Sequence, residues 1–159
     1  MTSQVKLLSV LYIFTLISCH SQNNNDAEME SGLWVYETAI INNGEKVDIT
    51  PFNKTLEKAA SARMPWAYSP LGIALKVAGQ QMISPEVNLV SKSLSGNELI
   101  TDVVVIVEKK ALPDDSMQDE YHRIRLKLGG SLWQVAEIKH AWRCRKGRGH
   151  QTLSAVLCK

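Results

Sequence analysis

Apolar and polar side chains alternate along much of the chain from residue 86 onward, and this period of two is typical of β-strands with one buried face. Short glycine-containing or acidic segments interrupt the alternation, which predicts turns between the strands. The expected long strands are Glu86–Ser93, 98–110, 118–128 and 131–144, followed by a short strand at 151–158. Consecutive strands joined by short turns predict an antiparallel meander.

The segment that precedes these strands has helical periodicity instead. Thr50 in front of Pro51 predicts the start of one helix, and Pro65 predicts its end. Ser69 in front of Pro70 predicts the start of a second short helix, with an apolar stripe on one side. Two short helices are therefore expected before the strand-rich part of the chain.

Residues upstream of the helices favour β-structure on both sides of Asn43 and Gly44. Both positions of an Asn-Gly pair accept positive φ, as the type I′ turn of a tight hairpin requires. We therefore expect a hairpin in which 33–41 pairs with 45–49. Together these elements predict an α+β fold, with an N-terminal hairpin and two short helices packed on a curved antiparallel meander sheet of four to five strands.

Alternation within the last two long strands predicts which side chains face the core. In 131–144 the core face would hold Leu132, Ala136, Ile138, Trp142 and Cys144, and the polar face Val135, Glu137, Lys139 and Arg143. In 118–128 the solvated face would hold Tyr121, Arg123, Arg125 and Lys127. Residues 103–107 are apolar on both sides, so this strand is expected in the centre with both faces covered, by the hairpin or by a partner chain.

The order of helices and long strands resembles the cystatin-like and NTF2-like α+β domains. The segment GGSLWQVAEI, residues 129–138, is similar to the glycine turn, tryptophan and valine of their later strands, and the resemblance covers 51–158. The ending WRCRKGRGHQTLSAVLC, residues 142–158, is similar to the tails of uncharacterised exported bacterial proteins. That second likeness implies no activity.

The first residues have the pattern of an export signal. One charge, Lys6, precedes a largely apolar run from 7 to 17, which is shorter than the roughly 20 residues needed to cross a bilayer. Leu-Ile-Ser-Cys at 16–19 resembles the bacterial lipobox, which implies that Cys19 is lipidated and becomes the N-terminus after cleavage. An uncleaved signal anchor or a buried hydrophobic hairpin is the alternative.

The expected organisation is a lipoprotein signal peptide at 1–18, a lipidated flexible tether at 19–31 and a single α+β domain at 32–159. The tether holds too few apolar side chains to order itself by burial. The membrane would be a partner through the Cys19 lipid. Because His20 is not the aspartate associated with inner-membrane retention, the lipobox resemblance implies the inner leaflet of the outer membrane, with the domain facing the periplasm.

Two cysteines remain once Cys19 is assigned to lipid. In an oxidising compartment Cys144 and Cys158 are expected to form a disulfide, which would contribute on the order of 3 kcal/mol in the chain-entropy model. A metal site that adds His140 and His150 would have a spacing that matches no zinc pattern, so no metal is assigned. Free, reactive thiols are a third alternative.

Charge is segregated along the chain, although the net charge is only +2. Residues 122–159 hold nine basic side chains and one acidic one, whereas 19–121 hold eight basic and fifteen acidic ones. Such asymmetry indicates an acidic protein or an envelope anion as a partner, and the compartment and the absence of a stacking platform argue against nucleic acid. The expected partner-binding residues are Arg123, Arg125, Lys127, Lys139, Arg143, Arg145, Lys146 and Arg148. Alternatively, this face is only solvated, or the acidic half of the chain neutralises it.

The common catalytic fingerprints, such as G-x-S-x-G, H-E-x-x-H and the P-loop, are absent from the sequence. His122 and His140 are expected among apolar residues, where a core histidine is more usual than a catalytic base. Asp102 interrupts an apolar run, and beside His122 it would be a candidate general base, but placement at a strand start explains it more simply.

The sequence therefore predicts a non-enzymatic binding or immunity/inhibitor-type lipoprotein that uses a basic sheet surface and needs no cofactor. One alternative is a carrier or sensor for a small ligand, with a pocket lined by Trp66, Tyr68, Trp133 and Trp142. The other alternative is a hydrolase that uses Asp102 and His122.

Overall fold

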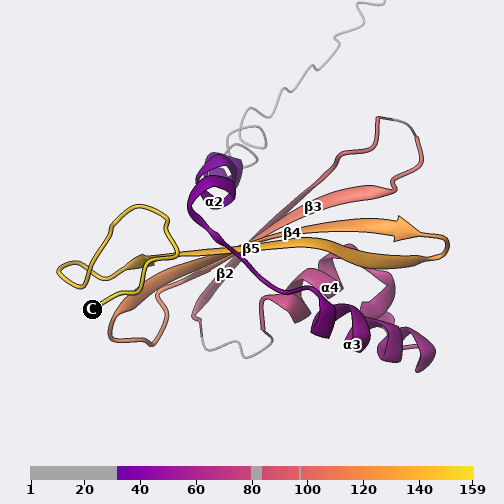
Figure 1. The fold of residues 1–159 in the computed structure, drawn as a ribbon, viewed down its shortest axis with the longest axis horizontal. Coiled ribbons are helices and arrows are strands. Elements are labelled where there is room, and N and C mark those ends of the chain that lie inside the picture. The colour runs from indigo at the N-terminus through magenta and orange to yellow at the C-terminus, as the bar shows by residue number, and fades with distance from the viewer. Residues whose placement is uncertain (1–31, 80–83, 97) are drawn as a thin grey trace, which may run out of the picture.

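Five strands form one antiparallel sheet in the order β1-β5-β4-β3-β2 (Figure 1). The structure, a computed structural model, describes residues 32–79, 84–96 and 98–159. The strands are β1 (Glu45–Lys46), β2 (Glu86–Ser93), β3 (Asp102–Lys110), β4 (Met117–Gly129) and β5 (Leu132–Cys144). Strands β2 to β5 follow one another as neighbours, so the predicted meander is confirmed. The predicted signal peptide, the predicted lipidation site Cys19 and the predicted tether lie outside the described residues.

The helices are α2 (Glu37–Asn43), α3 (Thr50–Ser61), the 3₁₀ helix η1 (Pro65–Tyr68) and α4 (Pro70–Val77). The two predicted helix starts are confirmed, because Pro51 lies in the first turn of α3 and the Ser69 hydroxyl caps α4 by accepting from the Gly72 amide at 3.3 Å. No helix in the described part of the chain is long and apolar enough to cross a membrane.

Helices cover both faces of the sheet (Figure 1). Helices α3 and α4 pack on one face around Leu56, Ile73, Ile124 and Ile138. Helix α2 and the residues before it pack on the other face, where Ile40 is fully buried. The alternate valines and isoleucines of β3 therefore meet a core on each side, and the prediction of a central strand covered on both faces is confirmed.

The predicted N-terminal hairpin is wrong. Residues 37–43 form α2, and only Glu45 and Lys46 form a strand, which pairs with β5 at His140 and Lys139. Apolar side chains recur three and four residues apart before Gly44, and burying that stripe against the sheet outweighs the β-propensity of the segment. Gly44 has an extended conformation instead of a turn conformation, and a side chain there would collide with the carbonyl oxygen of Ile40.

The predicted facing of β5 is wrong in its first half. Arg125 pairs with Glu137 but Leu126 pairs with Val135, so Ala136 is an extra residue in a β-bulge. A bulge breaks the period of two, and as a result Val135 is buried at 2% exposure while Ala136 is exposed. On β4, the predicted solvated face is covered by α2, which buries Tyr121 and Arg123.

The short strand predicted at 151–158 is also wrong. This segment makes a single antiparallel bridge, between Ser154 and Trp142. Its other hydrogen bonds join it to different elements of the fold. The amide of Ala155 donates to the Asn43 carbonyl at 3.1 Å, and the Trp142 indole donates to the Val156 carbonyl at 3.1 Å. The segment therefore wraps around the end of β5 as a loop.

Candidate functional site

The basic residues of the C-terminal half do not form one open surface. Arg123 lies beneath α2, where its guanidinium donates to Glu37 at 2.9 Å and to Glu137 at 2.7 Å. Farther along the strand Arg125 donates twice to Asp102, at 3.0 and 2.7 Å, and these hydrogen bonds lower the pKa of that carboxyl. Acidic side chains, two of them from before residue 122, thus neutralise this part of the predicted surface.

Lys127 and Lys139 are also occupied. The ammonium of Lys127 lies 3.9 Å from Asp102, and that of Lys139 donates to the Gly44 carbonyl at 3.3 Å. Arg148 makes an exposed ion pair with Asp115 at 3.3 Å. None of these five basic residues adjoins the groove in which the remaining three predicted residues meet.

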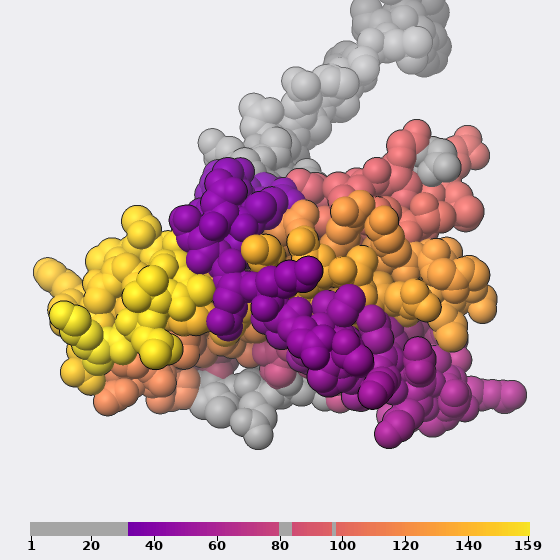
Figure 2. Space-filling view, in the orientation of Figure 1, coloured from indigo at the N-terminus to yellow at the C-terminus, as the bar shows by residue number. Residues whose placement is uncertain are grey.

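Arg143, Arg145 and Lys146 line one open groove of about 660 Å³ at the end of the sheet. The groove is also lined by residues that the sequence pattern did not single out, namely Glu86, Lys110, Ala111, Gln118 and Asp119. It lies where β3 and β5 end and β2 and β4 begin, so the meander brings together residues that are far apart in the chain. Figure 2 shows the C-terminal segment gathered at one end of the molecule, beside α2.

Two basic side chains of the groove, Arg145 and Lys146, form no ion pair with any carboxylate among the residues that the structure describes. The Arg145 guanidinium donates to the carbonyls of Asp114 and Leu112, at 2.7 and 2.6 Å. The Asp114 carboxylate, whose pKa is lowered mainly by backbone amides and in part by the Arg145 charge, lies nearby but forms no direct ion pair with it. Lys146 is exposed and makes no ion pair or hydrogen bond within the described ranges. A held guanidinium beside a free ammonium is an arrangement that attracts carboxylates or phosphates.

A buried polar network supports the groove from beneath. Arg143 donates from one nitrogen to Asp119 at 2.6 Å and to the Tyr121 hydroxyl at 2.8 Å, and that hydroxyl donates to Glu108 at 2.5 Å. Tyr121, Glu108 and Asp119 are at most 3% exposed. Burial and the Glu108 carboxylate raise the pKa of the Tyr121 phenol, so the phenol remains a donor. This network, the Arg143 network, fixes one wall of the groove.

The opposite face of the same strands holds a second polar group, which we call the histidine cluster: Lys109, Glu120, His122 and His140. Alternation places Glu120 and His122 on one face of β4, and His140 lies directly opposite His122 on β5. The two imidazole rings stack with centroids 4.2 Å apart, and Lys109 forms an ion pair with Glu120 at 2.6 Å.

Burial controls the charge states in the histidine cluster. Burial, together with the neighbouring His140, lowers the pKa of His122 to about 3, so its imidazole is neutral in the folded protein. Burial alone would raise the pKa of Glu120, but contacts with His140 and Lys109 lower it to about 2. The cluster therefore pairs an ionised carboxylate with a neutral imidazole.

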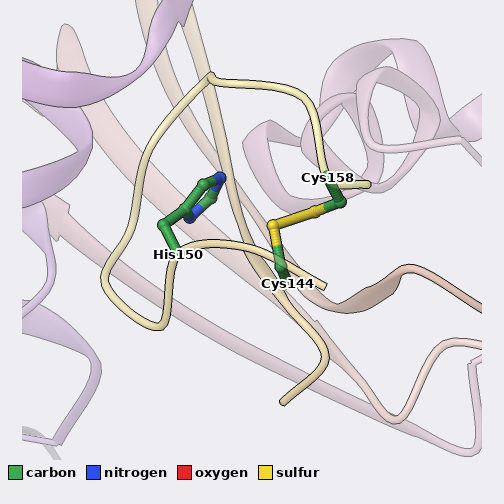
Figure 3. Close-up of side chains that lie close together, drawn as sticks. All are labelled: Cys144, His150 and Cys158. Atoms are coloured by element: carbon green, nitrogen blue, oxygen red, sulfur yellow. A yellow bond between two sulfur atoms is a disulfide. The ribbon is translucent and has the colours of Figure 1, made fainter. Parts of the chain in front are cut away.

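The predicted disulfide between Cys144 and Cys158 is present, with its Cα atoms 5.6 Å apart (Figure 3). His150 lies beside it, and both ring nitrogens face carbonyl oxygens, those of Thr152 at 2.8 Å and Val156 at 2.7 Å. The sulfur atoms and the His150 ring lie close enough to surround a metal ion, but sulfurs joined to each other are not thiolate ligands. The disulfide and His150 thus hold the C-terminal loop on β5.

Asp102 and His122, the residues of the hydrolase alternative, are not brought together. Asp102 pairs with Lys127 and His122 with Val107, so these two residues lie at different ends of β3 and β4 and form no catalytic pair. The cavity beside Trp133, between α3 and the sheet, has a volume of about 30 Å³. That volume is room for about one water molecule, far below the several hundred Å³ of a ligand pocket.

The histidine cluster was missed by sequence reasoning. Its signal was Glu120-x-His122, a same-face pair on a strand, together with His140 on the next strand, but their proximity depended on a register that the bulge shifts. Comparison with known protein families, with curated proteins and with solved structures finds no match to this chain. The two sites therefore have to be interpreted from their own geometry.

Proposed function

We propose that this chain is a lipid-anchored protein of the bacterial cell envelope that binds an acidic segment of another protein, without catalysis, in the groove formed by Lys110, Arg143, Arg145 and Lys146. An immunity or inhibitor protein that blocks a toxin or an envelope enzyme fits this arrangement, because a tether raises local concentration. The lipobox-like residues at 16–19 support the anchor, and the disulfide agrees with an oxidising compartment.

The observation that carries the proposal is the pair Arg145 and Lys146. The other two groove cations are paired, Lys110 with Glu86 and Glu108, and Arg143 with Asp119. Arg123, Arg125 and Arg148 are each paired with a carboxylate, whereas Arg145 and Lys146 have none within ion-pair distance in the described part of the chain. The Nε–H of Arg143 is buried and also lacks an acceptor there. Carboxylates of a partner would supply the missing negative charge beside Arg145 and Lys146.

Fluorescence anisotropy with a labelled polyglutamate peptide tests the groove on the purified full chain. We expect binding at low salt that weakens steeply as salt is added, because the contact is electrostatic. Lys146→Glu should weaken binding by about tenfold or more, as expected when one attractive contact becomes repulsive. Lys58→Glu makes the same charge change on an exposed site of α3, and an equal loss in that variant would show non-specific attraction and contradict the proposal.

The anchor is tested separately by mass spectrometry of membrane-extracted protein. We expect a diacylglycerol-modified N-terminus at Cys19, and Cys19→Ser should release the chain from the membrane fraction. Recovery of an uncleaved, unmodified N-terminus would overturn the anchor and leave the groove experiment unaffected.

A further inference from the structure

The histidine cluster has the layout of a metal site on one face of a β-sheet. Glu120 and His122 are two residues apart on β4, so their side chains point the same way, and His140 is the direct cross-strand partner of His122. One donor atom of each residue lies within 4.8 Å of the donors of the other two. Two imidazoles and a carboxylate are a ligand set that suits Zn²⁺.

The atoms around His140 follow the order of a carboxylate–histidine–metal arrangement. The Nε2 atom lies 3.4 Å from an oxygen of Glu120, and on the other side of the ring Nδ1 lies 3.5 Å from an oxygen of Glu45. Ligand atoms about 2.0–2.1 Å from a tetrahedral zinc ion are about 3.3 Å from each other, which matches the first distance. Glu45 occupies the position of the outer carboxylate that orients a metal-bound histidine.

One ring nitrogen of the cluster lacks a partner. His122 Nδ1 is buried and has no hydrogen-bond partner among the described residues, and His140 Nε2, also buried, makes no hydrogen bond there and has only the Glu120 oxygen 3.4 Å away. Buried polar atoms without partners are unusual in proteins.

Lys109 is the group that opposes a cation here, and its placement limits that effect. Its ammonium contacts one oxygen of Glu120, while the other oxygen faces His140. The ammonium also donates to the Ala78 carbonyl, which fixes it on the helix side of the cluster. Lys109 therefore holds the carboxylate in place and leaves one oxygen available to an ion.

We propose that Glu120, His122 and His140 bind one Zn²⁺ ion, with Glu45 orienting His140 and the fourth coordination position open to water. The side chains of Glu120 and His140 are 15% and 19% exposed, which provides access for the ion. Ca²⁺ and Mg²⁺ are excluded as occupants because they prefer oxygen ligands. The site is on the face of the sheet opposite the Arg143 network, so it is independent of the proposed acidic-segment binding.

Competition between the tag-free full chain and a chromogenic zinc chelator tests the site. The assay omits reducing agent, so that Cys144 and Cys158 stay joined and cannot bind zinc as thiolates. We expect one Zn²⁺ per chain and no binding of Mg²⁺ or Ca²⁺. Glu120→Gln and His140→Asn should each weaken binding by about 100-fold or more, and Glu45→Gln by about tenfold, as for outer-shell partners.

The matched control is His150→Asn, which removes a histidine outside the cluster and should leave zinc affinity unchanged. Zn²⁺ should raise the melting temperature of the wild type but not of Glu120→Gln, and circular dichroism without metal shows that each variant is folded. Absence of stoichiometric zinc binding, wild-type affinity in both cluster variants, or loss of binding in His150→Asn would each overturn the proposal. Lys146→Glu should bind zinc normally, so the zinc result does not depend on whether the groove binds an acidic segment.

Discussion

The two faces of β4 and β5 carry polar networks that differ in what they lack. On the face covered by α2, Arg143, Asp119, Tyr121 and Glu108 bind one another, and within the described ranges the buried atom left without a partner is an N–H donor of Arg143. On the opposite face, among the same residues, a ring nitrogen of His122 has no partner, and this imidazole is neutral. A spare donor favours an anion, whereas a spare imidazole lone pair favours a cation. Adjacent residues of one strand, whose side chains point to opposite faces, can therefore bind ligands of opposite charge.

The largest expected effect comes from breaking the Arg143 network. Asp119→Ala removes a buried carboxylate that accepts from the Arg143 guanidinium and the Ala111 amide, and we expect a loss of about 3 kcal/mol in the free energy of unfolding, measured by urea denaturation. Asp115→Ala removes the carboxylate of the exposed pair with Arg148 and should change stability little. Similar losses in both variants would contradict the distinction between buried and exposed pairs.

The histidine cluster should make stability depend on pH. The folded pKa of His122 is about 3 and its ordinary value is about 6.5, so between these values the unfolded chain binds a proton that the folded chain does not. Stability is therefore complete above about pH 6.5 and falls as pH is lowered toward 3, by a few kcal/mol. Glu120, with a folded pKa of about 2, adds to the loss below about pH 4.5.

Urea denaturation across pH 3 to 7 without added metal measures this slope. His122→Gln removes the titrating ring and should flatten the profile between about pH 6.5 and 4.5, where Glu120 adds little. Ile124→Val, a buried substitution two residues along β4, should lower stability equally at each pH and retain the slope. An unchanged slope in His122→Gln would contradict the assignment to His122.

A smaller effect is expected from removing a single hydroxyl of the Arg143 network. Tyr121→Phe deletes the donor to Glu108 and the acceptor for Arg143, and hydrogen bonds to charged groups contribute about 1.5–3 kcal/mol. We expect a loss of about 2 kcal/mol in denaturation experiments. Tyr68→Phe deletes a hydroxyl that donates to the Ala60 carbonyl at a half-exposed site, and it should cost less. Equal costs would show that the network adds nothing beyond one ordinary hydrogen bond.

Much of the fold was predictable because it depends on local rules. Pro51 and Pro70 fix helix starts, and period-two alternation located β2 with its observed bounds and β4 to within one residue at each end. The prediction of a hairpin at Gly44 was wrong because this segment, which also favours strands, can bury its apolar stripe as a helix. That choice was decided by contact with a sheet formed from residues much farther along the chain.

The candidate sites were less predictable than the fold. Segregation of charge located Arg143, Arg145 and Lys146, but it also selected basic residues that the acidic half of the chain neutralises. Arg123, for example, is paired with Glu37, which is 86 residues earlier. Charge counts along a sequence do not show which charges meet, since an ion pair depends on packing across elements.

The sequence by itself determined the order of α3, α4 and the long strands, the meander and the pairing of Cys144 with Cys158. Each depends on neighbouring residues or, for the disulfide, on the small number of cysteines available. The tertiary structure decided what covers each face of the sheet and where the bulge at Ala136 shifts the register. Those two decisions place the histidine cluster on one face and the Arg143 network on the other. The physical reason is that alternation assigns a side chain to a face, whereas burial and register, which are properties of the packed chain, determine what it meets there.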